Sequence, residues 1–288
     1  MLPLLAVSIG GVEKNNRAED NTLEFLQGFK RAFQGGYFEG VPLDPMTPST
    51  YGIYGYNSIL YTVYSACIRP YITSNTVVLE IGPGRGAWSK TFLHRNCRKL
   101  YAVDVAEPEH THFWDYVGRD ARAEYIVVND LLLTPVPDDS IDFFFSFGVF
   151  CHLKPEMCED YLLSIFRKMK RGSRGFLMIA DFDKYEKCRA DAGHLSIGRF
   201  LVEQKRRIWI PAKLGYLFAW QFFREKMDLE PVSKSRDKNL WTAEGNFGWY
   251  HWGVERACEA LTRVGFEIVE ADIEVCQRDP LIHFRKPQ

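Results

Sequence analysis

Apolar residues between positions 76 and 181 alternate between two spacings. Short apolar runs, several of them rich in β-branched residues, are typical of buried parallel strands; they lie at 76–81, 99–105, 123–130, 140–150 and 174–181. Between them, helices are predicted at 87–94 and 108–118, and from Pro155 to a stop at Gly172. This alternation predicts an open parallel sheet with helices on both faces, that is, an α/β fold.

The alternation stops after Asp181 for about 70 residues and then returns. Residues 253–276 predict a helix that ends at Gly265 and a following strand, and 280–286 predict a last strand. We therefore divide the chain into four parts. They are an N-terminal segment with a helical lid (1–75), a ligand-binding core (76–181), an aromatic-rich insertion (182–250), and a closing helix with two strands (251–288).

The bulk composition excludes several classes of protein. The chain has 288 residues and a formal net charge of −1, so no overall field attracts it to nucleic acid or to anionic membrane. Seven scattered Cys favour a reducing compartment, and their spacing matches no zinc site. The apolar start lacks a basic region before it, and no run reaches the roughly 18 residues of a membrane span. We expect a cytoplasmic protein without a metal.

The first predicted strand ends in a glycine-rich turn, and the turn indicates the ligand. Gly82, Gly84 and Gly86 form G-x-G-x-G, which is neither the dinucleotide pattern G-x-G-x-x-G nor a P-loop. An acid, Glu80, stands directly before them. An acid at a helix start repels phosphate but favours an ammonium or sulfonium group. The pattern favours a positively charged nucleoside.

This stretch resembles motif I of the class I S-adenosylmethionine-dependent methyltransferases, E/D-x-G-x-G-x-G. Further matches follow: Asp104 ends the second strand, where the family keeps an acid for the ribose hydroxyls, and Asp130 follows the third strand, where an acid accepts from the adenine amino group. The resemblance covers roughly 75–181 and 252–288. It implies a seven-stranded Rossmann-like sheet with an antiparallel last strand, and S-adenosylmethionine as cofactor. The implied cofactor residues are Glu80, Gly82, Gly84, Gly86, Asp104, Val105, Asp130, Leu131 and Phe147.

Aromatic residues gather on both sides of the core. Seven of the 14 Tyr lie between Tyr37 and Tyr71, and a sulfonium is stabilised by aromatic faces. Tyr54 is therefore a candidate cofactor contact in a lid, although these tyrosines equally suit packing of a helix on the sheet. Five of the 7 Trp lie between Trp209 and Trp252. The predicted insertion at 182–250, which holds most of these Trp, suits an acceptor pocket, a small helical core, or a peripheral membrane contact.

The end of the fourth predicted strand bears on the acceptor of the methyl group. Strand four ends in Ser146-Phe147-Gly148 instead of the N/D-P-P-Y/F of the enzymes that methylate amino groups of DNA and protein. We therefore expect a small-molecule acceptor and no nucleic acid. The favoured reaction is O-methylation of a sugar, glycolipid or secondary metabolite. The alternatives are C- or N-methylation, aminopropyl transfer, and a catalytically silent cofactor-binding subunit.

A hydroxyl acceptor must lose a proton, and position ranks the histidines as bases. His152 follows the fourth strand and His251 precedes the last helix, so both are expected at the ligand-binding edge of the sheet. The alternative role for His152 is to brace its loop or to line the cofactor pocket.

Overall fold

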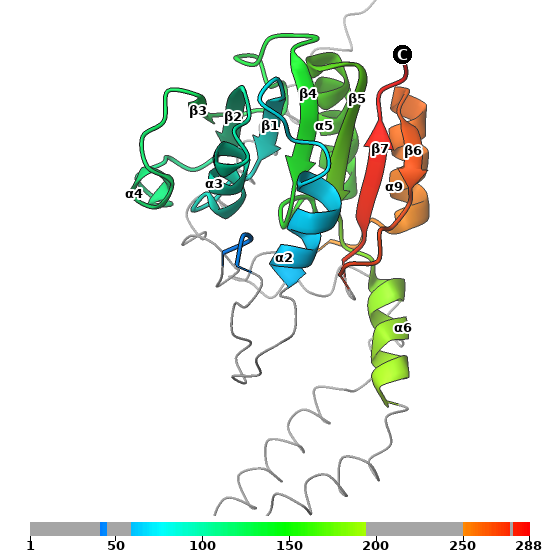
Figure 1. Cartoon of the computed structure of the whole chain (residues 1–288). Coiled ribbons are helices and arrows are strands. Elements are labelled where there is room, and N and C mark those ends of the chain that lie inside the picture. Colours follow the sequence, from blue (N-terminus) through cyan, green and yellow to red (C-terminus); the bar gives the residue numbers. More distant parts are fainter. Residues whose placement is uncertain (1–40, 45–58, 194–249, 277–278) are drawn as a thin grey trace, which may run out of the picture.

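A computed structural model describes residues 41–44, 59–193, 250–276 and 279–288 of the chain (Figure 1). Seven strands form one sheet in the order β3-β2-β1-β4-β5-β7-β6. β7 is antiparallel to both of its neighbours, and the other strands are parallel. The predicted fold class is thereby confirmed. The strands are β1 (Val77–Ile81), β2 (Lys99–Asp104), β3 (Ala123–Val127), β4 (Ile141–Ser146), β5 (Met169–Met178), β6 (Glu267–Glu270) and β7 (Leu281–Arg285).

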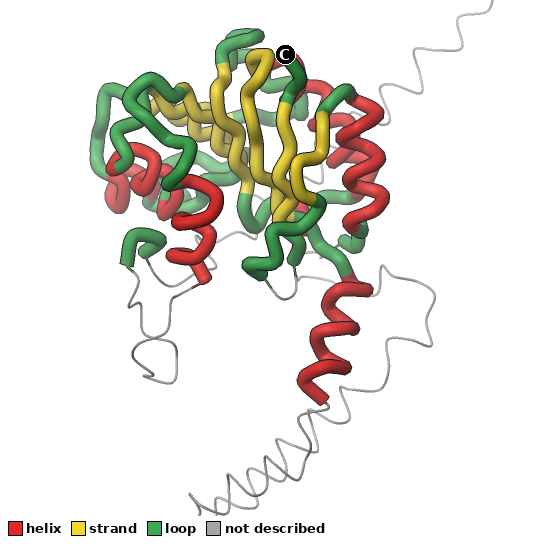
Figure 2. The backbone as a smooth tube through the Cα atoms, turned by 45° about the vertical axis from the view of Figure 1, so that its right-hand side comes forward, coloured by secondary structure: helices red, strands yellow, loops and turns green. Residues whose placement is uncertain are grey.

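Helices cover both faces of the sheet (Figure 2). One apolar core joins α2, the following π-helical turn η1, α3 and α4 to one face, and a second core joins α5 and α9 to the other. β4 separates these cores with three adjacent phenylalanines, 143–145, all at most 1% exposed. The helices are α2 (Ile59–Val63), η1 (Tyr64–Ile68), α3 (Ala87–His94), α4 (Phe113–Val117), α5 (Pro155–Lys168), α6 (Phe182–Gly193) and α9 (Val254–Val264).

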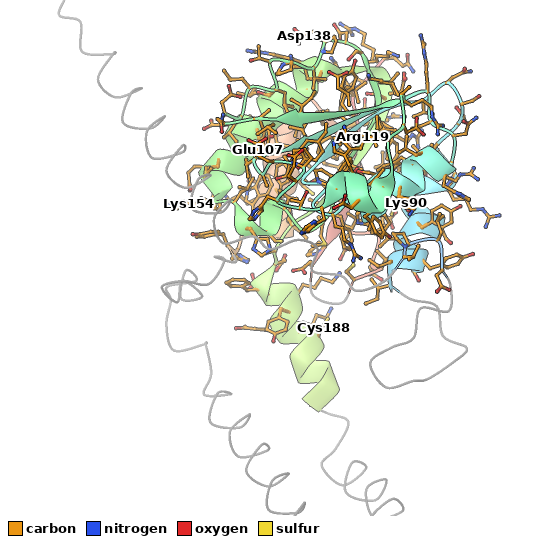
Figure 3. The ribbon with its side chains drawn as sticks, turned by 90° about the vertical axis from the view of Figure 1, so that its left-hand side faces the viewer. Lys90, Glu107, Arg119, Asp138, Lys154 and Cys188 are labelled. Atoms are coloured by element: carbon orange, nitrogen blue, oxygen red, sulfur yellow. The ribbon has the colours of Figure 1, made fainter. Side chains whose placement is uncertain are left out.

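Asp181 fixes the point where the chain leaves the core and returns to it. One carboxylate oxygen accepts from the amides of Asp183 and Lys184 at 2.9 and 3.0 Å, which caps α6. The other accepts from the amide of Val254 at 3.0 Å, at the start of α9. α6, which carries Cys188, extends away from the sheet (Figure 3). Most of the predicted insertion, and Tyr54 in the predicted lid, lie outside the described residues.

The boundary between α5 and β5 differs from the sequence prediction. α5 ends at Lys168, and Gly172 lies inside β5 instead of stopping the helix. The reason is distant in sequence: the amide of Gly172 donates to the carbonyl of Lys286 at 2.9 Å, and the amide of Lys286 donates to the carbonyl of Ser173 at 2.9 Å. The C-terminal residues thus provide backbone partners that extend the strand, and local periodicity does not show them.

Candidate functional site

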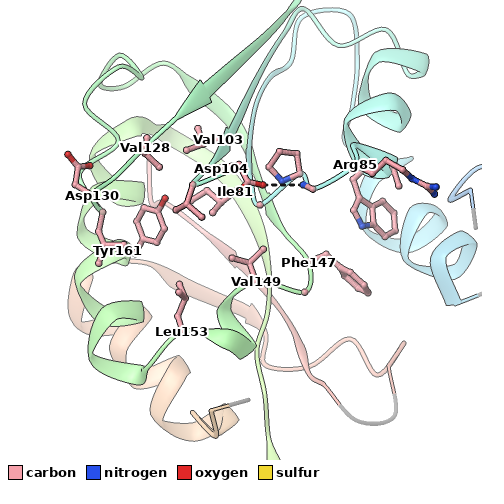
Figure 4. A pocket seen from close by; sticks show the side chains of 18 of the residues that line it. Ile81, Arg85, Val103, Asp104, Val128, Asp130, Phe147, Val149, Leu153 and Tyr161 are labelled. Atoms are coloured by element: carbon pink, nitrogen blue, oxygen red, sulfur yellow. Dashed lines mark hydrogen bonds between the residues drawn. The ribbon is translucent and has the colours of Figure 1, made fainter. Parts of the chain in front are cut away.

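A cavity opens at the carboxyl ends of the parallel strands, where ligands bind in open α/β sheets. Its empty volume, the open mouth included, is about 1070 Å³. Figure 4 shows its wall, built from the ends of β1, β2 and β3, the loop after β4, and α5. Most of the cofactor residues expected from the sequence line it: Gly82, Gly84, Asp104, Val105, Asp130, Leu131 and Phe147.

The glycine turn is fixed by a backbone hydrogen bond to the end of β2 and by packing against Val149 in the loop after β4. The amide of Gly82 donates to the carbonyl of Val103 at 2.8 Å, which ties the turn to the end of β2. Gly82 has a φ of +72°, and a β-carbon there would overlap Cγ2 of Val149. The turn therefore needs glycine at this position for both its backbone conformation and its space. Gly86 does not line the cavity and immediately precedes α3.

Asp104 links the turn to the end of β2. Its carboxylate accepts from the amide of Gly84 at 3.2 Å, as Figure 4 shows, and from the amide of Ala106 at 3.0 Å. Burial raises the pKa of Asp104 above its ordinary value, against the opposing effect of these amides. Each carboxylate oxygen accepts one of these bonds and has a further lone pair, so the group still has capacity for donors from a ligand in the cavity.

Asp130 occupies the next strand end along the same edge. It is exposed, and its carboxylate accepts from the amide of Leu132 at 2.9 Å, which shapes the loop after β3. Asp104 and Asp130 are the carboxylates of the cavity wall within the described residues. Two acceptors in sequence along one edge suit a ligand that carries hydroxyl or amino donors at two places.

Glu80 lies beneath the turn and not on the cavity wall. Its side chain is 1% exposed, and one carboxylate oxygen accepts from Oγ of Ser89 on α3 at 2.5 Å. The other oxygen, Oε1, has no hydrogen-bond partner in the described part of the chain. Burial raises the pKa of Glu80 to about 8, while the Ser89 hydrogen bond opposes the shift and Asp104 adds to it. A direct contact between Glu80 and a cofactor amino group stays a prediction.

This carboxyl makes stability depend on pH. The folded protein keeps a proton on Glu80 between the ordinary pKa of 4.5 and about 8, where the unfolded chain has lost it. Stability without ligand is therefore expected to fall as pH rises through that window, by an amount on the order of a few kcal/mol. The variant Glu80→Gln should show a flatter profile in urea unfolding at pH 5, 6.5 and 8. Parallel pH profiles for Glu80→Gln and the unchanged protein would contradict this prediction. The control is Glu124→Gln, at a half-exposed strand position, which should keep the pH profile of the unchanged protein.

The two candidate bases are at the expected edge but do not line the cavity as the described residues form it. His152 lies in the short 3-10 turn η2 (Phe150–His152), where its amide donates to the carbonyl of Val149 at 2.8 Å. Nδ1 of His251 accepts from the amide of Phe182 at 3.0 Å. Because a backbone amide is always the donor, the neutral ring of His251 carries its proton on Nε2. This arrangement disfavours proton abstraction by His251, and its role as a base stays a prediction.

Sequence reasoning missed several residues of the wall. Leu60, Val128, Leu153 and Tyr161 line the cavity, and their positions in apolar stripes look like ordinary core. Trp88 also lines it, with its ring centroid 5.2 Å from that of Phe147. Arg85 contributes to the wall, but its guanidinium lies 4.5 Å from the ring centroid of Tyr116.

Within the described ranges, no group of three or more His, Cys, Asp or Glu side chains is arranged to hold a metal ion. No helix in those ranges has both the length and the apolar character needed to cross a bilayer.

Comparison with known proteins identifies the core. Residues 79–177 match a family model described as a methyltransferase domain. The chain shares its fold with a S-adenosylmethionine-dependent methyltransferase from Mesorhizobium loti, at a TM-score of 0.52 and 15% identity over 80% of this chain and 98% of that one. It is also similar to the 1,6-didemethyltoxoflavin-N1-methyltransferase of Burkholderia thailandensis, at a TM-score of 0.50 and 13% identity over 99% and 94%. No curated protein sequence matches.

Proposed function

We propose that this chain methylates a small molecule, with a hydroxyl as the favoured acceptor, because residues 79–177 match a methyltransferase domain and the sheet has the fold of S-adenosylmethionine-dependent methyltransferases. The observation that carries the proposal is the order of groups along one cavity. Two carboxylates stand at the ends of β2 and β3, the glycine turn follows at β1, and aromatic side chains stand beyond the turn.

The residues present fit the cofactor. Asp104 would accept from the ribose hydroxyls and Asp130 from the adenine amino group, each at the strand end where the wall offers an acceptor. Gly82, with a φ of +72°, keeps the turn in a conformation that leaves it on the cavity wall beside Val149. When bound, S-adenosylmethionine supplies a methyl group already activated on a sulfonium. Trp88 and Phe147 would place aromatic faces against that charge and exclude water, which favours a straight-line displacement.

The aromatic end of the cavity suggests the character of the acceptor. Leu60, Trp88 and Phe147 are each at most 7% exposed, and they present apolar surface there. The one cationic side chain of the described wall, Arg85, contacts Tyr116 with its guanidinium. An uncharged acceptor with a substantial apolar surface fits this end better than a sugar phosphate. A hydroxyl of such a compound, with His152 as the candidate base, is our first choice.

N-methylation of a heterocycle is the second candidate. The Burkholderia thailandensis relative of the same fold is an N-methyltransferase of a small heterocycle, and its crystal structure holds both that compound and S-adenosylhomocysteine. A neutral ring nitrogen can act as nucleophile through its own lone pair. An apolar cavity end without a charged base on the described wall suits this chemistry as well.

The proposal is tested by ligand-induced stabilisation followed by methyl transfer. S-Adenosylhomocysteine at 100 times its dissociation constant should add about 2.7 kcal/mol to stability, while NAD should add nothing. Labelled S-adenosylmethionine is then offered with phenols, glycosides and heterocyclic amines. Label in a phenol or glycoside, reduced at least tenfold in His152→Ala, supports O-methylation. Label in the amines alone supports the second candidate, and stabilisation by NAD alone would refute both.

A further inference from the structure

Tyr161 is a polar residue of the cavity wall with an unused hydrogen-bonding group. It lies on α5, is 4% exposed, and packs its ring on that of Phe150, with centroids 5.7 Å apart. Figure 4 shows it between Asp130 and Val149, with the hydroxyl toward the end of β2. The hydroxyl makes no hydrogen bond within the part of the chain that the structure describes. Because Tyr161 lines the cavity, a ligand bound there can accept a hydrogen bond from this hydroxyl.

The surroundings of Tyr161 keep its hydroxyl a donor. Burial raises the pKa of Tyr161, and the nearby carboxylates of Asp104 and Asp130 raise it further. The phenol therefore stays protonated at every physiological pH. Both carboxylates accept from backbone amides: Asp104 from those of Gly84 and Ala106, and Asp130 from that of Leu132.

The wall around Tyr161 has acceptors in excess of donors. The other side chains at this end are aliphatic or acidic, namely Val103, Val105, Val128, Leu131, Asp104 and Asp130. Carboxylates recognise the hydroxyl and amino donors of an adenosine. The ring nitrogens of adenine are acceptors, and they need a donor that neither acid can supply. Among the described side chains at this end, Tyr161 is the one that can donate.

We propose that the Tyr161 hydroxyl donates a hydrogen bond to a ring nitrogen of the cofactor's adenine and so helps to select adenine. The inference rests on the proposed function, because it requires the cofactor to occupy this cavity. It assigns Tyr161 a binding role in contact with the cofactor, separate from that of the two acids. In the protein without ligand the hydroxyl stabilises nothing, and its contribution comes only with the cofactor.

The test compares Tyr161→Phe with the unchanged protein by calorimetric titration of S-adenosylhomocysteine. Loss of one hydrogen bond should weaken binding about 5- to 30-fold. The melting temperature without ligand should stay the same or rise, because the removed hydroxyl has no partner in the protein. Tyr71→Phe is the matched control: Tyr71 stacks near Phe143 and Phe176, does not line the cavity, and should leave affinity unchanged.

Analogues of S-adenosylhomocysteine that lack N1, N3 or N7 identify the partner atom. One of these three deaza compounds should bind the unchanged protein about 5- to 30-fold more weakly and bind Tyr161→Phe equally weakly. This measurement on the unchanged protein holds even if the variant fails to fold. The inference is overturned if Tyr161→Phe binds S-adenosylhomocysteine as tightly as the unchanged protein does. It is also overturned if the unchanged protein loses the same affinity for all three deaza analogues. Failure of the unchanged protein to bind S-adenosylhomocysteine would instead refute the proposed function.

Discussion

Replacing Asp104 by alanine is expected to weaken the binding of S-adenosylhomocysteine by about 100-fold or more. A hydrogen bond to a charged acceptor contributes about 1.5–3 kcal/mol, and two ribose hydroxyls would lose such a partner. The same change releases the amides of Gly84 and Ala106, which loosens the glycine turn. Removal of a buried carboxylate offsets part of that loss of stability, because burial disfavours its charged form. Calorimetric titration and urea unfolding measure the two effects separately.

The chain offers a close control for this variant at the opposite edge of the sheet. Asp142 is the second residue of β4, and its carboxylate accepts from the amide of Val77 at 2.9 Å and from Nζ of Lys170 at 2.7 Å. Asp142→Ala should therefore destabilise the fold without changing affinity for S-adenosylhomocysteine. If Asp104→Ala bound within fivefold of the unchanged protein, Asp104 would serve only to brace the turn, and its proposed role toward the ribose would be wrong.

Most helices and strands could be predicted from local sequence patterns, because each element buries apolar residues at the spacing typical of its own type. The predicted helices at 87–94 and 253–264 agree with α3 and α9, and Gly265 ends α9 in the left-handed conformation. The acids at 104 and 130 lie at the strand ends where the cavity opens, because carboxyl ends of parallel strands share one edge. The cavity-lining residues that were expected are those on strand ends and turns, where sequence position alone determines the edge.

Features that depend on distant partners were not predictable. The early start of β5 depends on backbone bonds from Lys286, more than a hundred residues later. Tyr161 occupies an inward position of α5, and its periodicity is the same whether it meets a core or a cavity. His251 satisfied the position rule for a base, but its bond with the amide of Phe182 depends on how the chain returns after the insertion. Pattern therefore finds the edge of the site, while three-dimensional contacts decide which side chains are free to act there.

Replacing Gly82 by alanine is expected to lower stability by about 2–5 kcal/mol and to weaken S-adenosylhomocysteine binding at least tenfold. Two effects add. A φ of +72° is unfavourable for any residue with a β-carbon, by about 1–2 kcal/mol, and overpacking in a filled site adds about 1–3 kcal/mol. The clash falls on Val149, which lines the same cavity, so relief of the overlap changes the shape of the site. Urea unfolding and calorimetric titration provide the two readings.

Two further variants separate the backbone effect from the clash. Gly118 has a φ of +85°, and a β-carbon there would have no atom within 4 Å, so Gly118→Ala measures backbone strain alone. Val149→Ala removes the two γ-methyl groups of Val149 and with them the overlap. The stability of the double variant Gly82→Ala/Val149→Ala should therefore approach that of Gly118→Ala. It should fall short by the stability that Val149→Ala loses on its own. Affinity should return with it only if the clash had displaced the loop after β4. If Gly82→Ala were no less stable than Gly118→Ala, Val149 would move aside freely. The close packing of the two loops, on which the shape of the methyl-donor site depends, would then be much looser than the structure indicates.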